Sequence, residues 1–216
     1  MRRKAAPKAV PRATQDEART PQRERGKQRV AALLDAAAAI FAEKGYEAAT
    51  MAEIAARAGA AIGSLYQFFP NKELLAGTLR AQYGDALYDD LAALREKAGA
   101  WTEEQLAEGL LSGWLDFLER HPGFMALVEA QAGLDAARAA DVRARMRQLI
   151  AGILQAHAPH LSQQGAASIA TAVLQTLKGA AALRIEAELP ERTAVLDQLR
   201  LMLQLYLKSQ LGGKSR

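Results

Sequence analysis

The residues from Ile62 to Phe69 place side chains that can contact nucleic-acid bases along one short helical pattern. On a helical wheel, Leu65 and Phe69 share an apolar face, whereas Gly63 and Gln67 lie on the opposite face. A glutamine amide can form two hydrogen bonds with the edge of an adenine, and glycine lets the backbone approach a major groove closely. We therefore expect Gln67 to be the main base-reading residue of this segment.

Signals that start and stop helices position this segment. Thr50 and Glu53 form a capping box at the start of a preceding helix, which Gly59 ends. Pro70 ends the next helix, because the residue before a proline is disfavoured in helical angles, and Asn71 is a good cap for a third one. Two short helices joined by a glycine-containing turn are typical of a helix-turn-helix, whose second helix enters the major groove of DNA.

The specific signal is the segment AGAAIGSLYQFFPNKELL together with the upstream AAAAIFAEKGYEAATMAEIA. These residues resemble the DNA-binding domain of the tetracycline-repressor (TetR) family of bacterial regulators, over about Val30 to Leu75 without a gap. The resemblance implies a helical C-terminal half that binds a small apolar or amphipathic effector, a homodimer, and release of operator DNA when the effector binds. It also implies a phosphate contact by Tyr66, whose ring can pack against the first helix at the same time.

Several residues around Gln67 complete the candidate interface. Thr50 and Lys72 stand at helix starts, where free amides and the helix dipole favour phosphate. The chain departs from the family's common pattern at Ala61, where a capping serine is frequent, and at Ile62, where a lysine or arginine is frequent. Ile62 is equally suited to packing and to a thymine methyl group, and the absence of Lys and Arg from this helix predicts A·T-rich contacts. The candidate DNA-binding residues are Thr50, Ala61, Ile62, Gly63, Ser64, Tyr66, Gln67, Phe68 and Lys72.

Composition favours an all-α fold. Half of the 216 residues are hydrophobic, alanine is abundant, and only 6% are aromatic. The absence of cysteine excludes disulfides and thiol catalysis. No run reads as a membrane span or a signal peptide, so we expect a cytoplasmic protein without a membrane partner.

The pattern predicts an N-terminal three-helix helix-turn-helix domain followed by six further helices, which the TetR resemblance implies form a ligand-binding and dimerisation domain. We expect a basic disordered tail over residues 1–22, the DNA-binding domain over 23–72, the C-terminal domain over 73–211, and a disordered end over 212–216. The first helix should begin near Arg23 or Gly26 and end at Lys44, before Gly45. The six C-terminal helices should cover about 72–97, 103–120, a short segment ending at 132, 135–156, 162–187 and 193–211.

Positive charge gathers at the N-terminus. Residues 1–29 hold ten Lys or Arg and three acids, a net charge of +7, whereas the remainder holds 18 and 21, a net charge of −3. The tail is either a basic arm that touches DNA or a solvated leader with no specific role, and the sequence leaves both open.

Aromatic and apolar residues in the C-terminal half could line an effector site, although ordinary core packing explains each of them as well. Gly109 and Gly113, one turn apart, either open space for a ligand or let another helix pack closely. The candidate ligand-binding residues are Tyr83, Leu87, Trp114, Phe117, Phe124, Met125, Val128 and Gln175.

The last two predicted helices have apolar stripes wider than one face, which suggests that they pack against two partners. One partner is the rest of the domain, and the other is the same helix pair of a second subunit; a monomer with a large core is the alternative. The candidate dimerisation residues are Ile169, Val173, Leu177, Val195, Leu199, Met202 and Tyr206.

Catalytic and metal chemistry finds little support. His157 and His160 are close in sequence, but Pro159 separates them and no acidic residue has ligand-like spacing. We find no nucleophile–base pair and no phosphate-binding glycine loop, so we expect no enzyme, no metal and no cofactor. A helical ligand carrier and an architectural DNA binder without effector control remain alternatives to a regulator.

Overall fold

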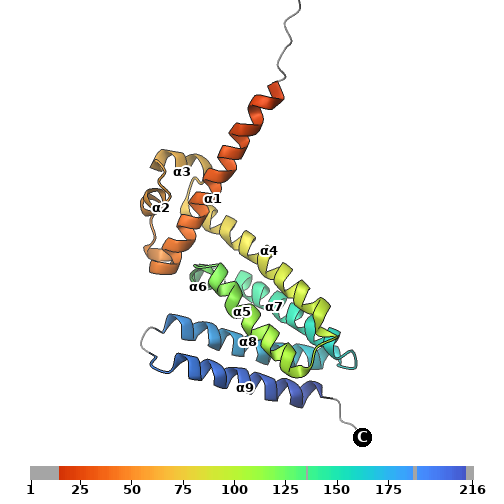
Figure 1. The fold of residues 1–216 in the computed structure, drawn as a ribbon. Helices are drawn as coiled ribbons and strands as arrows, with labels where there is room; N and C mark the ends of the chain where they lie inside the picture. The colour runs from red at the N-terminus through yellow and green to blue at the C-terminus, as the bar shows by residue number, and fades with distance from the viewer. Residues whose placement is uncertain (1–14, 135, 187–188, 213–216) are drawn as a thin grey trace, which may run out of the picture.

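The computed structural model describes the backbone of residues 15–134, 136–186 and 189–212, and their side chains except at 15–23, 131–134, 136, 138, 184 and 185. Every regular element in these residues is a helix, so the all-α prediction is confirmed (Figure 1). The helices are α1 (Gln15–Ala48), α2 (Met51–Arg57), α3 (Ile62–Phe68), α4 (Lys72–Ala98), α5 (Glu103–Arg120), α6 (Phe124–Leu134), α7 (Ala136–His157), α8 (Gln163–Ile185) and α9 (Arg192–Leu211).

The helix-turn-helix has the caps that the sequence predicts. The Thr50 side chain accepts from the Glu53 amide at 3.3 Å, and the Glu53 carboxylate accepts from the Thr50 amide at 3.1 Å. Gly59 has φ of 62°, the left-handed angle that ends α2. Ala61 gives α3 no side-chain cap, whereas the Asn71 side chain accepts from the Leu74 amide at 2.7 Å and caps α4.

The first helix is longer than expected. α1 begins at Gln15, before the expected Arg23 or Gly26, so residues 15–22 of the predicted disordered tail are helical. At the other end Gly45, with φ of 78° and ψ of 168°, interrupts the helix where the sequence predicts its end. Residues 1–14 and 213–216, on which the rest of the predicted disorder falls, lie outside the described residues.

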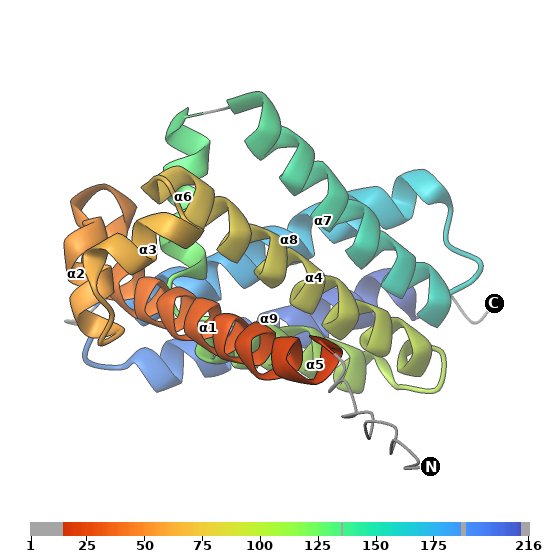
Figure 2. The ribbon, with the colours of Figure 1, turned by 90° about the horizontal axis from the view of Figure 1, so that it is seen from above.

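Helices α4 to α9 build a second layer around a continuous apolar core. α7 packs against both α4 and α8, and α5 packs against α9 (Figure 2). Phe41 in the DNA-binding half and Phe117 in the C-terminal half are fully buried and belong to the same cluster. Burying such a side chain contributes about 1.5–3 kcal/mol to the free energy of folding. Because both residues belong to one cluster, the same core stabilises both halves of the chain.

α1 also meets the start of α6. Gly123 has φ of 84°, and a β-carbon built there would lie 2.6 Å from the Ala38 carbonyl oxygen of α1. Beside it, the Tyr83 hydroxyl of α4 donates to the Pro122 carbonyl oxygen at 2.9 Å. The turn before α6 therefore fits closely against the DNA-binding half, and only glycine fits at position 123.

One helix among the described residues, α8, is long and apolar enough to cross a membrane by length and composition alone. From the sequence we expected no such segment. An 18-residue window within Gln163–Leu183 has a mean hydropathy of 1.3, and 44% of that window is buried inside the fold. α8 packs against α7, α5 and α9, which is the environment of a core helix.

Candidate nucleic-acid interface and sensing domain

The recognition-helix candidate α3 separates core from solvent as the wheel predicts. The Leu65 side chain is fully buried, whereas Gly63 and Gln67 are exposed and Tyr66 is 48% exposed. Ile62 is 43% exposed, so its side chain is available to a ligand rather than packed in the core. The exposed face of α3 therefore carries one amide, one phenol and one β-branched apolar side chain around a glycine.

A residue that the sequence analysis missed joins this face. Arg29 of α1 is exposed, and its Nη1 donates to the Ser64 hydroxyl oxygen at 3.3 Å. The only sequence signal for it is the positive charge of residues 1–29, because the distance from Arg29 to Ser64 depends on how α1 and α3 pack.

Lys72, expected to contact phosphate, is engaged within the protein. Its Nζ donates to the carbonyl oxygens of Tyr46, Glu47 and Ala49 at 2.7, 3.1 and 3.0 Å, and lies 4.4 Å from the centre of the Tyr46 ring. These bonds fix the start of α4 to the chain that leaves α1. A phosphate contact by Lys72 would have to replace one of them.

A second contact holds the same junction. The Tyr46 hydroxyl donates to the Glu73 carboxylate at 2.8 Å, and Glu73 also pairs with Arg80. Burial, followed by the hydrogen bond to the Glu73 carboxylate, raises the pKa of Tyr46 to about 12. The end of α1 and the first turns of α4 are therefore joined by side-chain contacts.

The predicted ligand-lining aromatics form a packed cluster. The Phe117 and Phe124 ring centres lie 5.0 Å apart at 88°, and the Trp114 and Phe117 ring centres lie 5.8 Å apart. Trp114 Nε1 donates to the Leu177 carbonyl oxygen of α8 at 2.9 Å. Burial and the nearby Asp35 carboxylate raise the pKa of Tyr83, at the edge of this cluster, to about 12. These rings pack as core in this conformation.

The structure does not bring all the candidate ligand residues together. Leu87 is buried and Met125 is half-buried, whereas Val128 and Gln175 are exposed and lie outside the aromatic cluster. At Gly109 the structure favours close packing over space for a ligand, because a β-carbon there would lie 2.6 Å from the Trp101 ring. Gly113 leaves ordinary contact, 3.5 Å, with Leu94.

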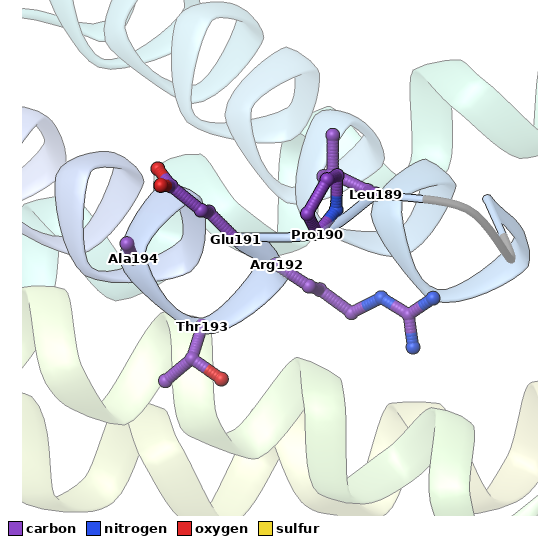
Figure 3. A pocket seen from close by; sticks show the side chains of 6 residues that line it. All are labelled: Leu189, Pro190, Glu191, Arg192, Thr193 and Ala194. Atoms are coloured by element: carbon purple, nitrogen blue, oxygen red, sulfur yellow. The ribbon is translucent and has the colours of Figure 1, made fainter.

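Two hollows lie away from these rings. A groove of about 370 Å³ runs between α4 and α7; its lining includes Leu91, Arg95, Glu96 and Leu149. An open hollow of about 740 Å³ surrounds the loop before α9, where the Glu191 and Arg192 side chains point in different directions (Figure 3). The second hollow is lined by one short segment, residues 189–194, so the groove between two helices is the better candidate for a small molecule.

Known proteins match both halves of the chain. Residues 33–78 match the family described as bacterial regulatory proteins of the tetR family, and residues 104–207 match the tetracyclin repressor-like C-terminal domain. The chain belongs to the tetR family. It is a transcriptional regulator of that family, with a DNA-binding helix-turn-helix in α2 and α3.

Curated relatives match part of this TetR-family chain. The transcriptional repressor KstR of Mycobacterium tuberculosis is 39% identical over 84 residues, which are 37% of this chain and 38% of the relative. KstR of Mycolicibacterium smegmatis is 44% identical over 63 residues, 29% of each chain. The matches thus span only 38% and 29% of the length of these curated relatives.

Solved structures share the whole fold. A TetR-like regulator from Rhodococcus sp. RHA1 has a TM-score of 0.64 and 23% identity, covering 86% of this chain and 97% of its own. A regulator from Aquifex aeolicus VF5 has a TM-score of 0.60 and 22% identity, covering 84% and 98%. At these identities the likeness concerns the fold alone.

The proposed dimerisation residues divide into two groups. Ile169, Val173 and Leu177 are buried in the protomer's own core, where their side chains pack within one chain. Leu199 and Tyr206 are half-buried against that core and Val195 is half-buried, whereas Met202 is 63% exposed. Next to Met202, the apolar side chains of Leu201 and Leu205 are also exposed.

His157 has a structural partner. Its Nδ1 lies 2.9 Å from the Ala98 carbonyl oxygen, a hydrogen bond that joins the ends of α7 and α4. In the sequence, His157 and His160 are close enough to be considered together as possible metal ligands. The bond to Ala98 gives His157 a structural role.

Proposed function

We propose that this TetR-family regulator is a cytoplasmic repressor that binds palindromic operator DNA as a homodimer and releases it when a small apolar or amphipathic effector binds the C-terminal domain. The observation that carries the proposal is the exposed face of α3, where Gly63, Tyr66 and Gln67 stand free while Leu65 anchors the helix. A helix held in this way can enter a major groove without disturbing the core.

Base contacts on this face come from few side chains. Gln67 is suited to adenine, and Ile62 to a thymine methyl group, because both are exposed on one helix. α3 itself contains no Lys or Arg. The preferred half-sites are therefore A·T-rich where α3 sits, and flanking phosphate contacts supply most of the affinity.

Dimerisation is supported by the outer surface of α9. Leu201, Met202 and Leu205 expose apolar area on one stripe, which a second copy of the helix would cover. Two protomers would present two α3 helices, and these must stand about 34–36 Å apart to enter successive major grooves. A palindromic operator follows from this two-fold symmetry.

Effector control is supported by the groove between α4 and α7 and by the continuity of α4. The groove combines apolar side chains of Leu91 and Leu149 with the charges of Arg95 and Glu96, which suits an amphipathic molecule. α4 runs from Lys72, bonded to the end of α1, to Ala98 at the far end of the groove. A ligand that binds one tilt of α4 better than another shifts the population away from the DNA-binding spacing.

The test is recovery of genomic DNA. Purified protein is mixed with fragmented DNA of the source genome at fixed physiological salt, and bound fragments are sequenced. Enrichment of a few palindromic sites is the expected result, and the genes beside them indicate the effector class. Broad recovery that disappears at higher salt and shares no site would contradict the proposal, since non-specific phosphate binding behaves in that way.

A further inference from the structure

A cation from α1 lies against the recognition-helix candidate. Arg29 Nη1 donates to Ser64 Oγ at 3.3 Å, and Ser64 lies in α3 between the exposed Gly63 and the buried Leu65. α3 has no Lys or Arg of its own. The guanidinium of Arg29 is therefore a positive charge that another helix supplies to the surface of α3.

Arg29 retains donors for a ligand. No described carboxylate forms an ion pair with it, whereas its neighbour Lys27 pairs with Glu24 at 3.8 Å and Arg57 pairs with Glu43 at 2.6 Å. A guanidinium has several N–H donors in a planar fork, and only one of them is used by Ser64. The free donors match the geometry of two phosphate oxygens.

The surroundings favour an anion. Arg25, Lys27 and Arg29 stand against a single acid, Glu24, in residues 24–29, and all four side chains are exposed. α1 continues past α3 and away from the body of the protein (Figure 1). A polyanion that meets α3 also meets this part of α1.

We infer that Arg29 contacts a backbone phosphate beside the groove that α3 enters, with Ser64 holding the guanidinium in place. The inference rests on the proposed operator binding and adds a residue to it. Phosphate contacts set affinity and register without reading sequence, so Arg29 and Gln67 have separable roles. The family often has a lysine or arginine at the position of Ile62. Arg29 places a positive charge on the surface of α3 that Ile62 does not provide.

The experiment compares Arg29→Ala with the wild-type protein and with Arg145→Ala, a matched control that removes one exposed arginine from α7. Affinity for an operator fragment is measured by fluorescence anisotropy at several salt concentrations, and thermal midpoints check that all proteins are folded. Arg29→Ala should weaken binding by roughly tenfold or more at moderate salt. It should also lower the slope of log affinity against log salt by about one for each protomer bound.

Two further measurements sharpen the test. The loss should be the same on operator variants with altered bases, because a phosphate contact is indifferent to sequence. Ser64→Ala should weaken wild-type binding by less than Arg29→Ala does, and should have no further effect in the Arg29→Ala background if its role is to hold the guanidinium.

Equal affinity and equal salt slope for Arg29→Ala and Arg145→Ala would overturn the inference. A loss confined to some operator variants would also overturn it, since that pattern belongs to a base contact. Failure of the proposed function is recognised separately, from wild-type protein that enriches no genomic site. In that case the salt slopes of the wild type and of Arg29→Ala on random-sequence duplex still decide whether Arg29 meets phosphate.

Discussion

At the scale of single residues, Gln67 is the side chain on which sequence discrimination depends. We expect Gln67→Ala to lose about 1–3 kcal/mol of discrimination between an operator and a variant with the contacted A·T pair replaced. Its salt slope should stay unchanged, because no charge is removed. Competition binding with a set of operator variants measures this. Gln175→Ala, another exposed glutamine, is the control. Unchanged relative affinities in Gln67→Ala would assign base reading to another residue.

Tyr83 gives the protein a defined sensitivity to alkaline pH. Its folded pKa of about 12 exceeds the usual value of 10.0, so the folded state holds the phenol proton more tightly than the unfolded state does. The resulting stabilisation is complete below about pH 10 and is lost as the pH rises towards 12. Tyr83→Phe should be less stable at neutral pH, from the lost bond to Pro122, but should lose less stability between pH 10 and 12.

Denaturant unfolding at a series of pH values measures this difference. Tyr88→Phe, at an exposed position on the same helix, is the control and should follow the wild-type curve. If the free energy of unfolding changed with pH in the same way for the wild type and Tyr83→Phe, the pKa of Tyr83 would be the same in the folded and unfolded states.

Residue roles were predictable from the sequence only where one helix face decides them. The wheel of α3 separates Leu65 from Gln67 because that short helix has a single partner surface. The intramolecular bonds of Lys72 could not be predicted in this way, because its three carbonyl partners belong to the end of α1 and the residue after it. The exposure of Val128 and Gln175 could not be predicted for a related reason: periodicity identifies apolar and polar types but not the neighbours that they meet.

At the scale of elements, the turn before α6 is the tightest junction between the two halves of the chain. Gly123 combines φ of 84° with a β-carbon position 2.6 Å from the Ala38 carbonyl oxygen, a backbone atom that cannot move aside cheaply. We expect Gly123→Ala to destabilise the protein by about 1–3 kcal/mol, from the strained angle and from overpacking. Gly84→Ala is the control: nothing lies within 4 Å of its β-carbon, and an alanine there should stabilise α4 by up to about 1 kcal/mol.

Thermal unfolding of both variants measures these opposite signs. Equal stability of Gly123→Ala and wild type would mean that α1 and α6 separate readily. The DNA affinity of Gly123→Ala then tests whether the same junction fixes the position of α3. α1 packs against α6 and also carries Arg29, which bonds to Ser64 of α3.

Element boundaries were mostly predictable, since caps and breakers are local signals. Thr50, Asn71 and Thr102 each bond the amide three residues on, and the helices begin where the sequence places them. The start of α1 was not predictable from such signals. Residues 15–22 are polar and include Pro21, a composition that reads as a solvated tail, yet the structure continues the helix through them.

At the scale of the whole molecule, burial separates core from interface where sequence patterns could not. α8 and α9 have apolar residues on more than one face, so a wheel cannot say which face meets the same chain. The protomer buries Ile169, Val173 and Leu177 itself and leaves Leu201, Met202 and Leu205 outside. The candidate subunit interface is therefore narrower than predicted and is centred on the outer stripe of α9.

This placement predicts the effect of charges on that stripe. The double substitution Met202→Glu and Leu205→Glu should leave the protomer folded, because both side chains are exposed, and should shift the sedimentation mass from dimer to monomer. Operator affinity should fall by about 10²–10⁴-fold, since the second half-site no longer binds as part of one assembly. Val142→Glu, at an exposed apolar position on α7, should change neither property. A double variant that remained dimeric would place the interface on another face, and the spacing of the two α3 helices would then have to be derived from that face.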